Sequence, residues 1–438
     1  MIDSAGLHTL SAEWMLLPNG WHQHMELSID KDGLIVSVGP AITPPDLPIC
    51  IPGMINLHSH AFQRHLVGRT QRFSRPEDDF WSWRSRMYSE AAALTTDSQF
   101  KGAQRLYADM LSHGYTTVCE FHYTHGAVQR DNAEIPVLMA ESLLRASEST
   151  GMRMMLLPVL YQQAGFGEQP LAPEQRSFGL DTQVYLRLIE HLRDESPRSP
   201  LQSIGYAPHS LRAVGLDSIR AVIDHRADTA PHAPVHIHIA EQVREVNECI
   251  LAHRKRPVEW LLDAFEPDSS WCLIHATHMS DPERRQLIER QITVGLCPTT
   301  EADLGDGFFP LSRFISEGGT WGIGSDSNLC VDPFQEIRLM DWQQRLSSRR
   351  RNAFKMDALL SVATRLYLQA CEGGRRASGM AVGRIEEGSS ADLVVLSDHH
   401  PLLDARTPDD ALAACMYSGD KSVISQVYTS GRPRLQTT

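Results

Sequence analysis

Between residues 52 and 370, the chain alternates short apolar runs with longer stretches that have the pattern of helices. The apolar runs have the length and composition of buried strands. Residues 137–149 have the periodicity of a helix. Another helix is predicted to start with Asp281 as its cap residue and Pro282 at the first helical position. The eight strand candidates centre on Ile55, Val118, Leu157, Tyr206, Ile237, Ile274, Val294 and Ile323. Eight strand–helix units predict an α/β fold, a (β/α)8 TIM-type barrel, whose functional site lies at the C-terminal ends of the strands.

The two ends of the chain differ from the middle, because both contain short strand-like runs and turns. Residues 24–38 predict a hairpin, and residues 391–396 and 423–428 predict further strands. Neither end has enough strands for a stable sheet of its own. We therefore expect both ends to form one small β-sandwich domain. The predicted bounds are residues 1–51 and 385–438 for the β domain and residues 52–384 for the barrel.

Composition excludes several classes of protein. Of the 438 residues, 42% are hydrophobic and 22% are charged, which is ordinary for a globular protein and excludes long disorder or a disulfide scaffold. The net charge of -13 argues against nucleic acid and anionic membranes as partners. None of the eight cysteines forms a CxxC pair, and we see neither a signal peptide nor a membrane span. We therefore expect a cytoplasmic protein, and a homodimer is compatible with the sequence.

One pair of histidines stands at the end of the first predicted strand. His58 and His60 follow the apolar run IPGMINL, and alternate residues of a strand point to the same face. Both imidazoles can therefore reach one metal ion. The same spacing occurs at His22 and His24, but this pair lies in the N-terminal β region, and we expect it at the surface.

Further candidate ligands stand at the ends of later strands. In VHIHI, His236 and His238 share a face, His238 lies nearer the C-terminal end, and Glu241 follows. His275 ends the run WCLIH, and Asp326 ends WGIGSD. Two structural alternatives stay open here. The histidines could be a core pair followed by a glutamate that starts a helix, and Asp326 could be a helix cap.

Together, histidines and acids occupy the ends of the first, fifth, sixth and eighth predicted strands. Three imidazoles, one carboxylate and an open position for water are the ligand set of a catalytic zinc ion. None of the lysines stands at a predicted strand end; they are Lys31, Lys101, Lys255, Lys355 and Lys421. A carbamylated lysine that bridges two metal ions is therefore not expected, and the sequence favours one metal ion per chain.

These residues lie in longer stretches that resemble the amidohydrolase superfamily, in its mononuclear deaminase branch. More narrowly, they resemble the family of formimidoylglutamate deiminases of histidine degradation. The matching stretches are PGMINLHSHAFQR, WSWRSRMY, EFHYTH, APHSLRAV, VHIHIAEQVREV, CLIHATHM, GLCPTTEADLGDGFFP and GIGSDSN. They run from Pro52 to Asn328, and the predicted β domain also fits. Asn328 departs from the pattern, because many relatives have a histidine there, and this leaves the shape of the last strand–helix loop open.

The resemblance implies a zinc-dependent hydrolase that converts N-formimino-L-glutamate and water to N-formyl-L-glutamate and ammonia. It implies one Zn²⁺ per chain, bound by His58, His60, His238 and Asp326. It assigns proton handling and orientation to Glu241, His275 and Asp326. It assigns recognition of the substrate to Gln63, Arg84, Tyr123, His209 and Arg212. A small dianionic substrate also requires local arginines in an acidic protein, because arginine binds carboxylates bidentately and stays charged.

Two other functions stay open at this point. A deaminase of a purine, pyrimidine or related heterocycle would keep the chemistry, but it would need aromatic stacking and neutral amide contacts in place of paired arginines. A barrel that has lost catalysis and serves as a scaffold is disfavoured, because all four metal ligands and both acids are present. Zinc content and ammonia release would separate a scaffold from either enzyme.

Overall fold

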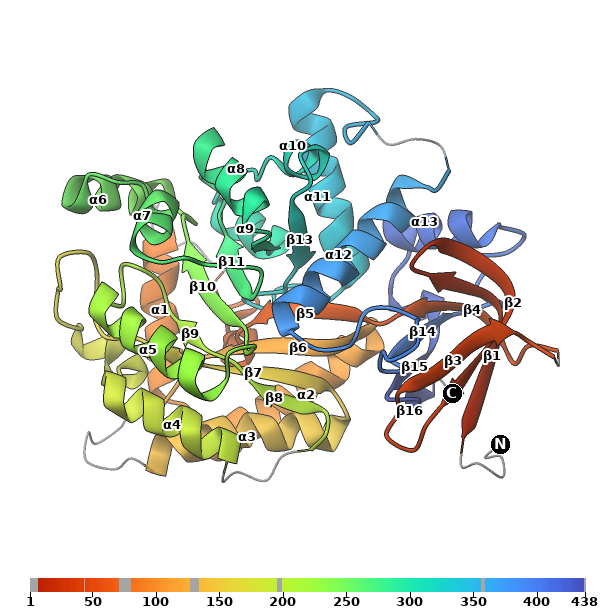
Figure 1. Ribbon diagram of the computed structural model, residues 1–438, viewed down its shortest axis with the longest axis horizontal. Coiled ribbons are helices and arrows are strands. Elements are labelled where there is room, and N and C mark those ends of the chain that lie inside the picture. The colour runs from red at the N-terminus through yellow and green to blue at the C-terminus, as the bar shows by residue number, and fades with distance from the viewer. Residues whose placement is uncertain are drawn as a thin grey trace.

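The computed structural model describes residues 7–42, 44–70, 80–126, 134–194, 199–355 and 359–436. The side chains of residues 80–82, 85 and 435–436 lie outside the described part, so half of the WSWR stretch lies outside it as well. Figure 1 shows a barrel on the left and a smaller β domain on the right, where the red N-terminal strands and the blue C-terminal strands lie together.

Eight parallel strands of the described chain form the barrel that the sequence predicts. They are β5 (Met54–Ser59), β6 (Tyr115–His122), β7 (Arg153–Leu160), the split strand β8 (Gln202–Ile204) and β9 (Ala207–Pro208), β10 (Val235–Ile239), β11 (Trp271–His275), β12 (Thr293–Leu296) and β13 (Thr320–Ile323). Hydrogen bonds join β5 to β8 and β10 to β13 in sequence order. Bridges from Tyr206 to Val235 and from Ser59 to Asp326 close the circle. Each predicted strand centre lies in a strand except Tyr206, which lies between β8 and β9.

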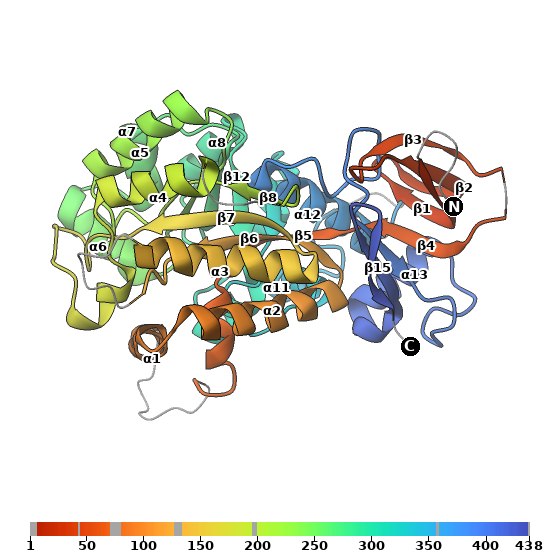
Figure 2. The same cartoon turned by 90° about the horizontal axis from the view of Figure 1, so that it is seen from below.

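Helices cover the outside of the barrel, and Figure 2 shows α2 and α3 lying along β6 and β7. The elements are η1 (Ala61–Leu66), α1 (Phe80–Ala92), α2 (Thr96–Ser112), α3 (Glu134–Thr150), η2 (Pro173–Phe178), α4 (Thr182–Asp194), α5 (Leu216–Thr229), α6 (Val243–His253), α7 (Pro257–Ala264), α8 (Asp281–Glu289), α9 (Pro298–Leu304), α10 (Leu311–Ser316), α11 (Pro333–Ser348) and α12 (Val362–Ser378). The predicted helix 137–149 is the central part of α3. The predicted cap of α8 is wrong by one residue, because the Ser280 side chain accepts the N–H of Glu283 and Asp281 is already helical.

Strands from both ends of the chain form one seven-stranded sheet in the order β16-β15-β14-β4-β1-β2-β3. Its elements are β1 (His8–Leu17), β2 (Gly20–Ile29), β3 (Ile35–Pro40), β4 (Leu47–Pro52), β14 (Leu393–Leu396), β15 (Ile424–Thr429) and β16 (Arg432–Gln436), with α13 (Pro408–Ser418) and η3 (Lys421–Val423) beside them. Antiparallel pairing of β4 with β14 joins the two ends of the chain. The sheet is attached to the barrel by a buried ion pair, in which Arg153 Nε lies 2.9 Å from Asp392 Oδ2.

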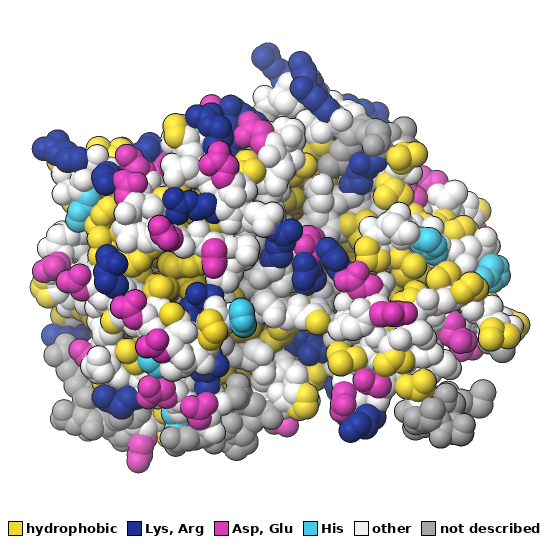
Figure 3. Space-filling view, in the orientation of Figure 1, with side chains coloured by type: hydrophobic (Ala, Val, Ile, Leu, Met, Phe, Trp, Pro, Cys, Tyr) yellow, Lys and Arg dark blue, Asp and Glu magenta, His cyan; other side chains and the backbone are white. Residues whose placement is uncertain are grey.

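The surface mixes charges of both signs. On the face drawn in Figure 3, acidic and basic side chains alternate, and Lys and Arg gather at the top edge over the end of α11. Within the described residues, every helix is too short or too polar to serve as a membrane span. Seven of the cysteines are buried, Cys330 is half-buried, and all eight are free thiols.

Closure of the barrel depends on a close approach of β13 to β5. The backbone N–H of Asp326 donates to the His58 carbonyl, and that of His60 donates to the Asp326 carbonyl, both at 2.9 Å. Gly324 makes this approach possible, because a Cβ at this position would lie 2.7 Å from His58 Cβ and 2.8 Å from His58 O. The glycine in GIGSD is therefore required by packing against the first strand.

We expect Gly324→Ala to lower the stability of the protein by about 1–3 kcal/mol, because an added methyl group would separate the two strands that close the barrel. Gly215→Ala is the matched control, since Gly215 has a negative φ of -70° and no neighbour within 4 Å of a built Cβ. Thermal unfolding followed by calorimetry measures the difference. Equal unfolding temperatures for the two variants would show that β13 can shift without cost.

Candidate metal centre and active site

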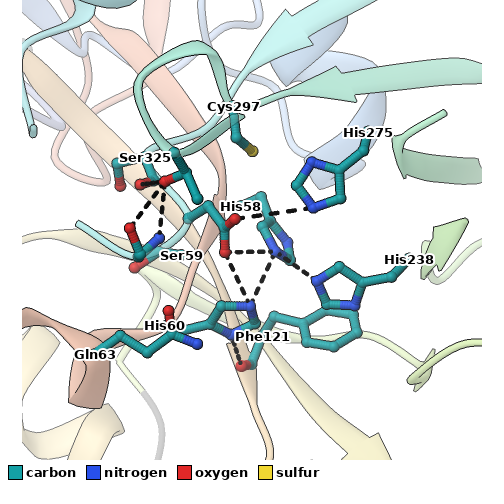
Figure 4. Close-up of polar contacts among 12 residues, drawn as sticks. His58, Ser59, His60, Gln63, Phe121, His238, His275, Cys297 and Ser325 are labelled. Atoms are coloured by element: carbon teal, nitrogen blue, oxygen red, sulfur yellow. Dashed lines mark hydrogen bonds and ion pairs between the residues drawn. The ribbon is translucent and has the colours of Figure 1, made fainter. Parts of the chain in front are cut away.

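The four predicted metal ligands meet at the mouth of the barrel. Figure 4 shows His58, His60 and His238 pointing toward one another. His58 Nε2 lies 3.1 Å from His60 Nε2 and 3.0 Å from His238 Nε2. Asp326 Oδ1 lies 3.2 Å from His60 Nε2 and 3.5 Å from His58 Nε2. All four side chains are buried, and their ligand atoms lie within 4.8 Å of one another.

Backbone carbonyls orient two of these imidazoles. His60 Nδ1 donates to the Phe121 carbonyl at 2.8 Å, and His238 Nδ1 donates to the His209 carbonyl at 3.2 Å. In a neutral ring whose Nδ1 carries the proton, Nε2 presents a lone pair. Burial, followed by the charge of His60, lowers the pKa of His58 to about 3, so this ring is neutral as well. Neutral imidazoles are the form in which histidine binds a metal ion.

The donor set fits a divalent metal ion. The Nε2 lone pairs of His60 and His238 and the Asp326 carboxylate surround one buried space. The imidazole of His58 completes the group. These groups would repel one another without a cation or shared protons between them. Three nitrogen atoms and one carboxylate oxygen match a catalytic zinc site, which keeps a position open for water. The residues present are therefore suited to hold Zn²⁺.

Glu241 and His275 stand beside this cluster. His275 Nε2 lies 3.7 Å from Glu241 Oε1 and 3.8 Å from Asp326 Oδ2. Burial acts to lower the pKa of His275, but Glu241, a hydrogen bond to Glu301 and Asp326 together raise it to about 10. Burial raises the pKa of Glu241. The three predicted proton-handling residues therefore surround one buried space and are coupled by charge.

A pocket with a cavity volume of about 40 Å³ opens onto the cluster. It is lined by all five predicted substrate contacts, which are Gln63, Arg84, Tyr123, His209 and Arg212. Arg212 Nη1 and Gln63 Oε1 are buried without a hydrogen-bond partner, so each lacks a polar group that a ligand can supply. Gln63 Nε2 donates to the Tyr123 hydroxyl at 2.8 Å. The amide oxygen of Gln63 therefore points away from Tyr123.

Both arginines of the pocket interact electrostatically with the hydroxyl of Tyr161. Arg84 Nη2 donates to the hydroxyl of Tyr161 at 2.6 Å. Although burial acts to raise the pKa of Tyr161, the charges of Arg84 and Arg212 lower it below its ordinary value. The positive charges therefore converge on one side of the pocket. This side is suited to bind an anion.

The structure also excludes the alternatives that the sequence left open for single residues. His236 does not join the cluster, because its Nε2 donates to the Ala377 carbonyl at 2.8 Å. Asp326 is not the cap of α11, since the Asp332 side chain accepts the N–H groups at the start of that helix. Glu241 precedes Gln242, the N-cap of α6, and its side chain faces His275. His24 lies on β2 and is exposed.

Sequence reasoning missed several buried acids that hold the site residues. Glu245 accepts the backbone N–H groups of Ala240 at 3.1 Å and Glu241 at 3.0 Å. Glu301 accepts a hydrogen bond from His275 Nδ1 at 3.2 Å. The spacing of Glu241 and Glu245 along VHIHIAEQVREV is the one signal that was available, because it places Glu245 in the first turn of the helix that follows the strand.

The last strand–helix loop is now defined around Asn328, whose effect the sequence left open. Its Nδ2 donates to the His60 carbonyl at 2.9 Å, and its Oδ1 accepts from Ser325 Oγ at 2.6 Å. Ser59 Oγ donates to Glu120 Oε2 at 2.9 Å, and Glu120 also accepts the N–H of the residue after His60. Asn328 therefore holds the segment that carries the first two ligands.

Comparison with known proteins agrees with this geometry. The model of the amidohydrolase family matches residues 49–434. The chain belongs to the amidohydrolase family. A formimidoylglutamate deiminase of Pseudomonas aeruginosa is 37% identical, and the alignment covers 97% of this chain and 94% of that protein. The predicted family and fold class are thus confirmed.

Two solved structures share the fold of this amidohydrolase. The crystal structure of an amidohydrolase from Brucella melitensis matches with a TM-score of 0.87 and 38% identity, over 98% of this chain and 95% of that one. An adenosine deaminase from Xanthomonas campestris with bound zinc matches with a TM-score of 0.78 and 22% identity, over 98% of this chain and 92% of that one. The second likeness concerns the fold alone.

We expect His238→Asn to remove the metal ion, because it deletes one of the four ligand atoms. His236→Asn is the matched control, since His236 lies on the same strand and is equally enclosed, but bonds to a backbone carbonyl outside the cluster. Elemental analysis of the purified proteins should find about one divalent ion per chain in the unmodified protein and in the control, and much less in His238→Asn. Two tightly bound ions per chain would contradict a mononuclear centre.

Proposed function

We propose that this amidohydrolase is a zinc-dependent formimidoylglutamate deiminase. It hydrolyses N-formimino-L-glutamate to N-formyl-L-glutamate and ammonia, a step of histidine degradation in the cytoplasm. The observation that carries the proposal is the pairing of a deaminase-type centre with two buried arginines, one of which has a nitrogen without a partner. The relative from Pseudomonas aeruginosa supports the same activity over nearly the whole chain.

The charge of the pocket supports a substrate with two carboxylates. Arg212 is buried and its Nη1 has no hydrogen-bond partner, which is costly unless an anion binds there. Arg84 lines the same pocket and is also buried. A neutral heterocycle would bring no negative charge to either guanidinium group. Formiminoglutamate offers one carboxylate to each arginine, and Gln63 Oε1 can accept an N–H of the substrate.

His58, His60, His238 and Asp326 would hold one Zn²⁺, which when bound lowers the pKa of its water to about 7. Asp326 accepts a proton from the water that attacks the formimino carbon. Glu241 protonates the imine nitrogen, so that the C–N bond breaks and ammonia leaves. His275 orients the attacking water through Nε2. Overall, the C=N bond of the formimino group is replaced by a C=O bond. Both protons of the water end on the imine nitrogen, which leaves as ammonia.

A panel of substrates tests the proposal. Ammonia release should be measured with formiminoglutamate, formimino-aspartate, guanine, cytosine and adenosine. Formiminoglutamate should give the highest kcat/KM, because it alone has both carboxylates at the spacing of glutamate. Higher kcat/KM with one of the heterocycles would replace this function by heterocycle deamination. No ammonia release with any substrate from a zinc-loaded protein would favour the scaffold.

Substitution of the two acids should separate metal binding from proton transfer. Glu241→Gln should keep the metal ion and lower kcat by about 10²–10⁴-fold, because it removes a proton donor without removing a ligand. Asp326→Asn should lower both kcat and metal content, because Asp326 is a ligand as well as a base. Kinetics and elemental analysis of the same samples measure both effects. Nearly full activity of Glu241→Gln would refute the assigned proton transfer.

Substitution of the arginines tests the recognition of the carboxylates. Loss of one partner of a buried charge pair costs about 2–5 kcal/mol, so Arg84→Met and Arg212→Met should each lower kcat/KM at least about tenfold. Zinc content should not change. Arg226→Met is the control, since Arg226 is also buried but bonds to Ala233 O and Ser270 Oγ outside the pocket. Normal kcat/KM in both pocket variants would contradict the binding of a dianion.

A further inference from the structure

We propose that Glu301 is a positioning residue for the reaction, because its carboxylate fixes the ring of His275 with Nδ1–H directed at Glu301 and Nε2 directed at the metal centre. Glu301 does not touch the pocket and acts through His275. The inference rests on the proposed function only for the identity of the reaction. It assigns a role to an acid that neither the sequence motifs nor the ligand set required.

Glu301 is placed with little freedom to move. It lies in α9, directly after β12, and its side chain is 1% exposed. Oε1 accepts from His275 Nδ1 at 3.2 Å and from the Cys297 backbone N–H at 2.9 Å. The bond to Cys297 anchors the carboxylate to the start of its own helix. The position of the Glu301 carboxylate relative to His275 is therefore fixed by its hydrogen bond to the Cys297 backbone.

The ring of His275 needs such an anchor. His275 ends β11 with a positive φ of 68°, so the backbone leaves the strand at this residue. Its Nε2 is buried and makes no hydrogen bond, although Glu241 Oε1 and Asp326 Oδ2 lie within 3.8 Å. Glu301 is the partner of Nδ1. A ring released from Glu301 can rotate and turn Nε2 away from the attacking water.

A carboxylate also fixes which nitrogen carries a proton. A carboxylate accepts hydrogen bonds, so Nδ1 of His275 is protonated whether the ring is neutral or charged. Nε2 is then the atom that faces the reaction. An outer acid orients a histidine in the same way in metal sites, where its loss typically costs about 10–100-fold in activity or metal affinity. The acid of a Ser-His-Asp triad plays the same part, and its loss costs about 10⁴-fold in kcat.

Two variants of Glu301 test the role. Glu301→Ala removes both hydrogen bonds and should lower kcat by about 10–100-fold. KM should change much less, since Glu301 does not line the pocket. Glu301→Gln keeps an oxygen that can accept from Nδ1 and Cys297, and it should recover a large part of the lost kcat. Zinc content should stay at the unmodified level in both variants.

Glu336 provides a matched control. It lies in α11 and is also fully buried. It accepts hydrogen bonds from the Thr299 N–H at 2.9 Å and from Thr299 Oγ1 at 2.6 Å, and Thr299 belongs to α9, the helix that carries Glu301. It has no bond to His275. Glu336→Ala therefore measures the cost of deleting a buried acid that supports α9. A fall in kcat no larger in Glu301→Ala than in Glu336→Ala would overturn the proposal.

A double-mutant cycle separates action through His275 from a general structural effect. In a His275→Asn background, adding Glu301→Ala should change the remaining kcat by less than about twofold, because the ring that Glu301 holds is gone. A further loss as large as in the unmodified background would refute the proposal. Histidine ¹⁵N correlation spectra give a readout that does not depend on activity. The His275 resonance, identified by its absence in His275→Asn, should show protonated Nδ1 in the unmodified protein and a changed pattern in Glu301→Ala.

These experiments distinguish failure of this proposal from failure of the proposed function. The kinetic comparison uses whichever substrate of the panel the unmodified protein turns over best. If that substrate is a heterocycle, the proposed function is wrong while the effect of Glu301 can still be measured. If formiminoglutamate is turned over but Glu301→Ala matches its control, the function stands and the positioning role is refuted.

Discussion

The pairing of the first barrel strand with the last is the interaction on which the site depends. Two backbone hydrogen bonds join Asp326 to the segment of His58 and His60, so ligands from opposite ends of the barrel sequence meet where the barrel closes. Gly324 permits this pairing, and the side chain of Asn328 bonds to the His60 carbonyl from the loop beyond. The metal centre and the closure of the fold are therefore one structural feature. A change that loosens either should affect the other.

Buried acids beyond the ligands hold this arrangement in place. Glu120, Glu245 and Glu301 each accept a backbone N–H group from a segment that follows a barrel strand. A buried carboxylate is costly unless it is hydrogen-bonded, and these bonds meet that requirement while they fix the loops. Positive φ angles at His275 and Asp326 show that the chain turns sharply where these residues leave their strands. Strained turns at a site persist only when the surroundings determine them, and the acids provide such surroundings.

Much of the fold and the ligand set could be predicted from the sequence, because each strand and the residue type at its end can be recognised from a short segment. Strand-like runs locate seven of the barrel strands directly, and the histidines and acids at their ends share one edge because parallel strands do. The split at Tyr206 could not be predicted, since it depends on how Tyr206 pairs with Val235 on the neighbouring strand β10. The positions of Glu120 and Glu301 relative to Ser59 and His275 likewise arise from tertiary contacts. The sequence shows that residue 324 is a glycine, but the reason for a glycine there is its short distance to His58, which only the structure gives.

Choice of substrate depends on a different part of the molecule from the chemistry. The fold is shared at a TM-score of 0.78 with an adenosine deaminase of 22% identity, so the barrel alone does not determine what binds. The metal centre lies at strand ends, whereas Arg84 and Arg212 come from α1 and from the loop after β9, where side chains can change without disturbing the barrel. Arg84 and Arg212 place two buried positive charges on one side of the pocket, and a buried charge is favourable only where it is well compensated. A substrate with two carboxylates would add a negative charge for each arginine, and this argument favours the proposed dianion over a neutral ring of similar size.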